Sequence, residues 1–241
     1  MFETTFITLF PEAFPGPLGV SILERARREG IWDWETIQLR EFGLGKHRNV
    51  DAPPTGGGAG MVLRPDVAAA ALDSIVTTNK HLIYLSPRGK PFTQEMAREY
   101  AASPGLVMFC GRFEGLDQRV IETHGLEEVS MGDFVLAGGE VAAMALTEAV
   151  VRLLPGVAGN ADSLSEESFE NGLLEYDQYT LPRQWGPYGT PDVLLSGDHK
   201  RIAEWRLNSA KALTKQRRPD LYAAYSETHD IQAPETGDEH Y

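Results

Sequence analysis

The sequence has few of the features that mark secreted or membrane proteins. Cys110 is its single cysteine among 241 residues, which excludes a disulfide framework and a site with several thiolate ligands. The chain has no run of about 18 apolar residues, which a membrane-spanning helix would need. Its beginning, MFETTFITLF, lacks the basic region of a signal peptide. We therefore expect a cytoplasmic protein without a membrane span.

Lysine and arginine are scarce as well, but they are unevenly distributed. The chain has 22 of them against 35 acidic residues, and an evenly spread net charge of −13 would argue against a nucleic-acid partner. Between His199 and Arg218, however, Glu204 is the only acid among many bases. Helical spacing places a polar set on one face there, namely Arg201, Glu204, Asn208, Lys211, Lys215 and Arg218. This basic stripe is either an ordinary solvated surface or a binding surface for a phosphate backbone.

Short β-rich runs alternate with helical patterns in the first part of the chain. The runs TTFITLF, WETIQL, HLIYLS and LVMFC predict strands, and helical patterns begin near Leu18, Pro65 and Phe92. The stretch EVAAMALTEAVVRLLPG is apolar over about four turns and predicts a buried helix that Pro155 and Gly156 end. The alternation is typical of an α/β fold with a mostly parallel sheet.

Composition divides the chain into three parts. Residues 1–158 form the predicted α/β domain, and residues 159–173 are expected to be a flexible acidic linker. Residues 174–241 form a smaller helical domain. From Ser226 onward the chain is acidic and poor in apolar residues, so we expect a disordered tail there.

Three segments with glycine or proline follow or include predicted strands. They are YLSPRG (84–89), CGRFEGLDQRV (110–120) and SMGDFVLAGGE (130–140). Loops at the carboxyl ends of parallel strands meet at one edge of a sheet and build its ligand site. The segments carry acids and little positive charge, which suits a ligand like S-adenosylmethionine better than a polyphosphate. The alternative is that Gly138 and Gly139 only end a buried strand.

Many ordered motifs over about residues 1–225 resemble the bacterial tRNA (guanine-N1)-methyltransferase (TrmD) family of the SPOUT superfamily. The motifs are TLFPEAF, GGGAGMVLRPD, YLSPRG, CGRFEGLDQRV, GDFVLAGGE, LPGVAGN, EESFENGLLEYDQYTLP, VLLSGDH and RRPDL. The resemblance implies a trefoil-knotted methyltransferase domain with a small helical C-terminal domain, working as a homodimer. It also implies S-adenosylmethionine as methyl donor, Mg²⁺ dependence, and tRNA as partner, with methylation at N1 of the guanosine 3′ of the anticodon.

The resemblance carries over to individual residues. It assigns the cofactor pocket to Tyr84, Leu85, Ser86, Pro87, Gly111, Phe113, Glu114, Met131, Gly132, Phe134, Leu136, Gly138 and Gly139. It implies RNA contacts by His47, Asp51, His199, Lys211, Lys215, Arg217 and Arg218. Phe113 and Phe134 stand where the family often has tyrosine, so hydrogen bonds by those side chains are not expected.

Methylation of guanine N1 requires removal of its proton, and the negative charge that develops spreads to O6. The resemblance assigns the base to Glu167, where the family commonly has aspartate, and the stabilising cation to Arg152. Glu166 is the alternative base. Histidine spacing identifies no metal site, and Glu114 is the candidate for Mg²⁺.

Two other functions stay open at this point. One is a knotted methyltransferase that acts on a ribose 2′-hydroxyl, and the other is a knotted RNA-binding module that has lost catalysis. The glutamate at the position of the base is the feature that favours the second.

Overall fold

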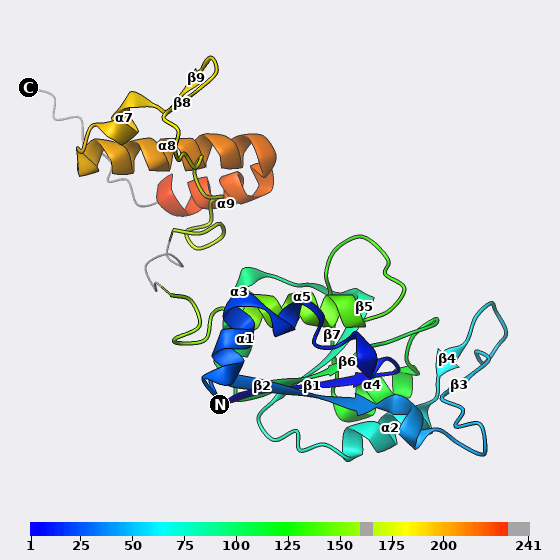
Figure 1. Cartoon of the computed structure of the whole chain (residues 1–241). Coiled ribbons are helices and arrows are strands. Elements are labelled where there is room, and N and C mark those ends of the chain that lie inside the picture. The colour runs from blue at the N-terminus through cyan, green and yellow to red at the C-terminus, as the bar shows by residue number, and fades with distance from the viewer. Residues whose placement is uncertain (160–165, 231–241) are drawn as a thin grey trace, which may run out of the picture. The chain divides into compact units, whose positions relative to one another are not determined.

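A computed structural model describes residues 1–159 and 166–230 of the chain (Figure 1). The chain divides into two compact units, Met1–Gly159 and Asn160–Tyr241, which are described separately. Parts of the expected linker (160–165) and of the expected tail (231–241) lie outside the described residues.

The first unit is built on a parallel sheet of five strands, four of which correspond to the predicted runs. The strands are β1 (Phe2–Thr8), β2 (Trp32–Gln38), β5 (His81–Pro91), β6 (Gly105–Phe109) and β7 (Glu127–Ser130), in the order β2-β1-β6-β5-β7. Successive side chains of β1 point to opposite faces, so Phe6 packs in one apolar cluster and Ile7 in the other. Burial on both faces explains the nearly continuous apolar runs in β1 and β6.

Helices cover both faces of this sheet (Figure 1). The helices α1 (Ser21–Arg28), α3 (Gln94–Ala101) and α5 (Glu140–Val151) contribute to one apolar cluster. The helices α2 (Pro65–Asp73) and α4 (Gln118–His124) contribute to the other. The predicted buried helix is α5, in which Ala143, Leu146 and Val150 are completely buried.

Short elements complete the first unit. Three 3-10 helices span Pro11–Ala13, Gly16–Gly19 and Leu39–Phe42, so the helix predicted near Leu18 begins at Ser21 as α1. The short strands β3 (Asp51–Ala52) and β4 (Val62–Leu63) pair antiparallel. The loop between them contains Gly56, Gly57, Gly58 and Gly60, all with positive φ, which glycine adopts without steric cost.

The second unit contains a hairpin and helices. Strands β8 (Gln184–Trp185) and β9 (Tyr188–Gly189) form the hairpin, followed by α7 (Asp192–Leu195), α8 (His199–Arg217) and α9 (Pro219–Asp230). Helices α8 and α9 pack against each other (Figure 1). The disorder expected from Ser226 is wrong for residues 226–230, because α9 continues to Asp230. Tyr222 and Tyr225 of α9 lie under lysine side chains of α8, contacts that composition does not reveal.

Candidate active site

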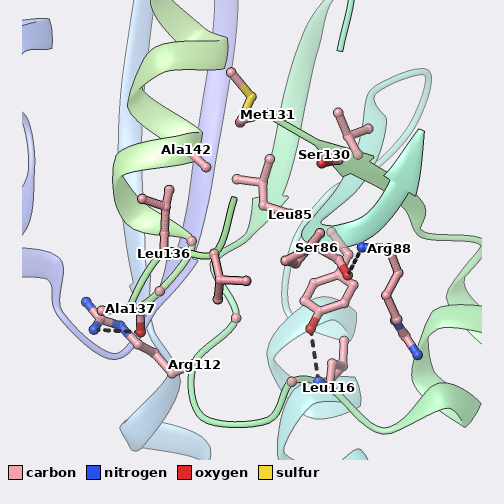
Figure 2. A pocket seen from close by; sticks show the side chains of 18 of the residues that line it. Leu85, Ser86, Arg88, Arg112, Leu116, Ser130, Met131, Leu136, Ala137 and Ala142 are labelled. Carbon is pink, nitrogen blue, oxygen red and sulfur yellow. Dashed lines mark hydrogen bonds between the residues drawn. The ribbon is translucent and has the colours of Figure 1, made fainter. Parts of the chain in front are cut away.

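The three predicted segments meet in one pocket of about 340 Å³, formed by residues 84–88 at the irregular middle of β5 and by the loops that follow β6 and β7 (Figure 2). All the residues predicted for the cofactor line this pocket except Gly132. Gly132 lies in the adjoining turn at φ +139°, and its N–H donates to Ser130 Oγ at 3.2 Å. The prediction that the loops converge is confirmed, while the ligand they hold stays a prediction.

Close backbone approaches explain the glycines of the pocket. The N–H of Gly139 donates to the carbonyl of Gly111 at 2.9 Å. A Cβ on Gly139 would lie 2.8 Å from Cα of Cys110, and a Cβ on Gly111 would lie 2.8 Å from the ring of Tyr84. These glycines therefore allow the loops after β6 and before α5 to touch, in addition to ending an element.

The pocket holds more positive charge than the sequence predicted, because Arg88 and Arg112 both line it. Arg112 pairs with Glu140 at 2.9 Å and donates from a guanidinium N–H to the carbonyl of Ala137 at 3.2 Å, as Figure 2 shows for Ala137. The guanidinium also covers the place where a Cβ on Gly138 would stand. Arg112 thus fixes the loop that precedes α5.

Glu140 faces inward and not toward the pocket. It is only 3% exposed, and its Oε1 accepts a hydrogen bond from Thr8 Oγ1 at 2.8 Å. Because Arg112 compensates its charge, Glu140 adds no uncompensated negative charge to the site. The sequence gave no sign of this pair, because its members lie 28 positions apart.

The loop 111–117 is fixed from two sides. Its Leu116 N–H donates to the hydroxyl of the buried Tyr84 at 3.1 Å, and burial raises the pKa of that phenol. Phe113 in the same loop is half-exposed at φ +61°, a left-handed conformation that is uncommon outside glycine and is often found at functional sites.

Residues in and next to strand β4 hold the backbone of the loop 111–117. The N–H of Leu63 donates to the carbonyl of Gly115, and that of Glu114 donates to the carbonyl of Met61, both at 2.9 Å. The Glu114 carboxylate lies where a Cβ on Gly60 would stand, which explains a glycine at position 60.

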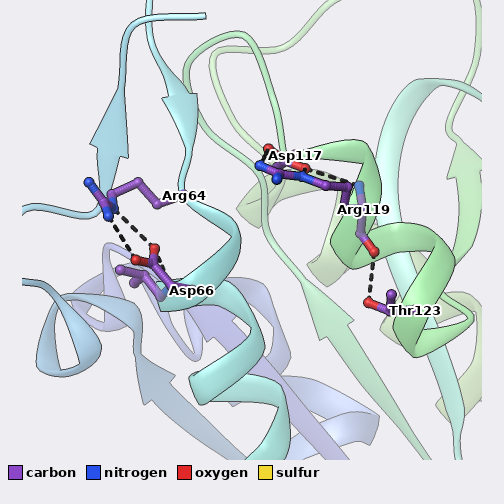
Figure 3. A network of polar contacts seen from close by, with 6 residues as sticks. Arg64, Asp66, Asp117, Arg119 and Thr123 are labelled. Carbon is purple, nitrogen blue, oxygen red and sulfur yellow. Dashed lines mark hydrogen bonds and ion pairs between the residues drawn. The ribbon is translucent and has the colours of Figure 1, made fainter. Parts of the chain in front are cut away.

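Two arginine–aspartate pairs hold the helix ends beside the loop (Figure 3). Arg119 donates to Asp117 at 2.8 Å, and Arg64 donates to Asp66 at 2.7 Å. Each arginine lowers the pKa of its carboxyl partner. Asp117 is also the N-cap of α4, because its side chain accepts from the N–H of Arg119.

The predicted catalytic residues belong to different units. Arg152 is the C-cap of α5 in the first unit. Glu167 lies in a turn of the second unit, where its carbonyl accepts from the N–H of Glu170 at 3.3 Å. Glu166, the alternative base, accepts hydrogen bonds from Tyr176 and Arg206, so its carboxylate is already engaged.

The residues predicted to bind RNA occur in both units. His47 and His199 are exposed, and Asp51 lies in β3. Arg218 is the C-cap of α8, its N–H donates to the carbonyl of Thr214, and its guanidinium pairs with Asp220 at 2.6 Å. Three further predicted bases belong to α8, namely Lys211, Lys215 and the exposed Arg217.

The basic stripe is partly covered by α9. The Nζ of Lys211 lies 5.5 Å from the ring of Tyr225, and that of Lys215 lies 5.8 Å from the ring of Tyr222. Lys211 is partly buried, whereas Lys215 stays exposed to solvent.

Within residues 1–159 and 166–230, no group of three or more histidine, cysteine, aspartate or glutamate side chains could hold a metal ion. Over the same ranges, no helix is both long and apolar enough to cross a membrane.

Comparison with known proteins gives a consistent result. The profile of the family described as tRNA (Guanine-1)-methyltransferase TrmD matches residues 2–224. A tRNA (guanine-N(1)-)-methyltransferase of Cereibacter sphaeroides is 57% identical over 229 residues, which cover 92% of each chain. The proteins of that name from Mesorhizobium japonicum and Ruegeria pomeroyi are 57% and 52% identical, over 93% and 95% of this chain and 97% and 96% of their own.

Proposed function

Because the chain belongs to the tRNA (guanine-1)-methyltransferase family, it methylates N1 of a guanine in tRNA, and we propose that this guanine lies at position 37, immediately 3′ of the anticodon. The observation that supports this most directly is the convergence of three motif loops on one pocket at the carboxyl edge of the sheet. The family excludes the ribose 2′-hydroxyl as the alternative target.

The residues of the pocket fit S-adenosylmethionine as the methyl donor. A volume of about 340 Å³ lies within the range of roughly 300–1,000 Å³ for small-molecule sites. Gly111 and Gly139 present bare backbone where a Cβ would intrude, and Leu85, Leu136 and Met131 add apolar walls. We propose that the thirteen predicted pocket residues hold the donor, Gly132 through its turn. When bound, S-adenosylmethionine supplies an electrophilic methyl group.

We propose that Glu167 accepts the proton of guanine N1 and that Arg152 stabilises the negative charge that develops on O6. A carboxylate is a suitable base because removal of the N1 proton frees the nitrogen lone pair for attack. A cation is needed because that lone pair is conjugated with the carbonyl at O6.

We also propose the homodimer and the trefoil knot that the family implies. Large apolar side chains are exposed around the pocket, including Phe113, Phe134, Val141 and Val135, the last at 82%. Such patches are typical of protein interfaces. The close contact of Gly111 with Gly139 is what a chain threaded tightly through its own loop would need.

A tRNA substrate also agrees with a cytoplasmic location. The proposed dependence on Mg²⁺ is tested by measuring activity after the ion has been removed with a chelator.

The decisive experiment combines purified protein, S-adenosylmethionine, Mg²⁺ and two unmodified tRNA transcripts, one with guanosine and one with adenosine at position 37. We expect 1-methylguanosine, located by nuclease digestion and mass spectrometry, in the first transcript only. Glu167→Gln should lower the rate by about 100-fold or more, since it removes the base. Methylation of neither transcript would contradict the proposal and favour an RNA-binding module without catalysis.

A further inference from the structure

The carboxylate next to the proposed base is held by two side chains of the second unit. Glu166 Oε2 accepts a hydrogen bond from the hydroxyl of Tyr176 at 2.8 Å. Arg206 of α8 pairs with the same oxygen at 3.2 Å, and its guanidinium lies 4.8 Å from the ring centroid of Tyr176. An isolated ion pair at this exposure contributes little to stability. Here a hydrogen bond, an ion pair and a cation–π contact connect the same three residues, so they act as a unit.

The 166–177 segment is attached to α8 at two more places. The N–H of Leu174 donates to Thr214 Oγ1 at 2.8 Å, and the N–H of Asp177 donates to Ser209 Oγ at 3.1 Å. Positions 206 and 209 are three apart and so are neighbours on the surface of α8, and Thr214 lies further along the helix. The 166–177 segment is therefore attached to α8 at three places (α8 is orange in Figure 1).

Residues on either side of Glu167 are fixed as well. Ser168 Oγ accepts from the N–H of Glu175 at 3.0 Å, and the N–H of Phe169 donates to the carbonyl of Leu173 at 2.8 Å. Phe169 adopts φ +77°, a backbone conformation that residues other than glycine rarely adopt. Such a conformation persists only where the surrounding structure imposes it. The turn that contains Glu167 thus has a defined conformation.

We propose that Tyr176 and Arg206 are positioning residues that fix the backbone of Glu167 through Glu166. This inference rests on the proposed role of Glu167 as the base. An error of about 1 Å in a base can cost large factors in rate, and the glutamate here carries one more methylene than the family's usual aspartate.

The test uses the full-length protein and two measurements. The first is hydrogen exchange of the amides of Phe169, Glu170 and Glu175, which does not depend on any activity. The second is the methyl-transfer rate in a single turnover at saturating tRNA and S-adenosylmethionine, with KM for tRNA determined separately. Tyr176→Phe removes the hydroxyl and keeps the ring, and its control is Tyr179→Phe, whose ring packs against Trp205. Arg206→Gln removes the cation, and its control is Lys200→Gln, an equal charge loss at an exposed site on α8.

We expect Tyr176→Phe and Arg206→Gln to speed exchange of these amides by about threefold or more. Both should lower the saturating rate by roughly tenfold while KM for tRNA changes by less than about twofold. The two controls should leave exchange and saturating rate as in the wild type.

Two results would overturn the inference. One is unchanged exchange in both variants, which would mean that the three contacts do not hold the segment. The other is faster exchange with an unchanged saturating rate, which would mean that the segment is held without positioning the base. If the wild type methylates no tRNA, the proposed function fails, and the exchange measurement still decides whether the segment is held.

Discussion

Gly139→Ala tests whether backbone contact at the pocket controls both stability and donor binding. Gly139 has φ −80° and ψ −10°, an ordinary helical conformation. On conformational grounds alone, alanine should stabilise the protein by up to about 1 kcal/mol, because it restricts the unfolded chain. The new Cβ, however, would lie 2.8 Å from Cα of Cys110 and 3.0 Å from N of Gly111. Carbon atoms in contact are normally about 3.5–4.0 Å apart, so a shift of roughly 0.7–1 Å is required.

The neighbours that must move are backbone atoms, and a rotamer change cannot relieve the contact. They directly follow β6, which lies between β1 and β5 in the sheet. Overpacking of this kind costs about 1–3 kcal/mol, and a lengthened hydrogen bond from Gly139 to Gly111 adds about 1 kcal/mol. The clash therefore outweighs the conformational gain, and we expect a net loss of about 2 kcal/mol with an affinity for S-adenosylmethionine lower by about tenfold.

Urea unfolding followed by circular dichroism measures the first effect, and titration calorimetry measures the second. Gly159→Ala is the matched control, because nothing lies within 4 Å of its Cβ position, and it should change stability by less than about 0.5 kcal/mol. A Gly139→Ala protein as stable as the wild type, with the same donor affinity, would refute the reasoning.

Two further changes test the charges beside the pocket. Glu140→Gln should lower the free energy of unfolding by about 2 kcal/mol, because it leaves the charge of Arg112 without its anion. Urea unfolding measures this loss, with Glu24→Gln as the control variant. Equal stability of the two variants would contradict the pairing. Asp117→Ala should cost about 1 kcal/mol, because it removes the cap of α4. Since Arg119 lowers the Asp117 pKa, that stabilisation is full above the ordinary value of 3.8 and is lost as pH falls through the lowered pKa. Unfolding curves of Asp117→Ala and wild type should therefore converge in strong acid, and a difference that stays constant with pH would count against the pairing.

The features that could be predicted from the sequence are those that depend on local pattern. The apolar runs of β1 and β6 predict buried strands, and the apolar stretch 140–151 predicts α5, because both signals reside within one element. Convergence of the three loops follows from the geometry of parallel strands. The identities of the individual pocket residues came from the family resemblance.

What could not be predicted depends on contacts between distant residues. The pairing of Arg112 with Glu140 joins two elements, so each charge looked like a ligand contact or a surface group when taken alone. Residues 226–230 are helical although their composition suggested disorder, and their printed contacts are made within α9, as where the ring of His229 stacks on that of Tyr225. The pairing of Glu166 with Arg206 joins residues 40 positions apart, so the sequence could not show that Glu166 is engaged by another side chain.

The order of strands in the sheet has a consequence for the synthesis of this chain. Strand β6 lies between β1 and β5, although both of these are made before it. The hydrogen bond from Thr8 to Glu140 joins residues 132 positions apart. At ordinary rates of translation, the ribosome needs roughly ten seconds to synthesise that length of chain. Until β6 emerges, β1 and β5 expose unpaired apolar edges that can associate with other chains. The pocket therefore forms only when the sheet is complete, and a chain that terminates before α5 lacks Glu140, the partner of Thr8 and Arg112.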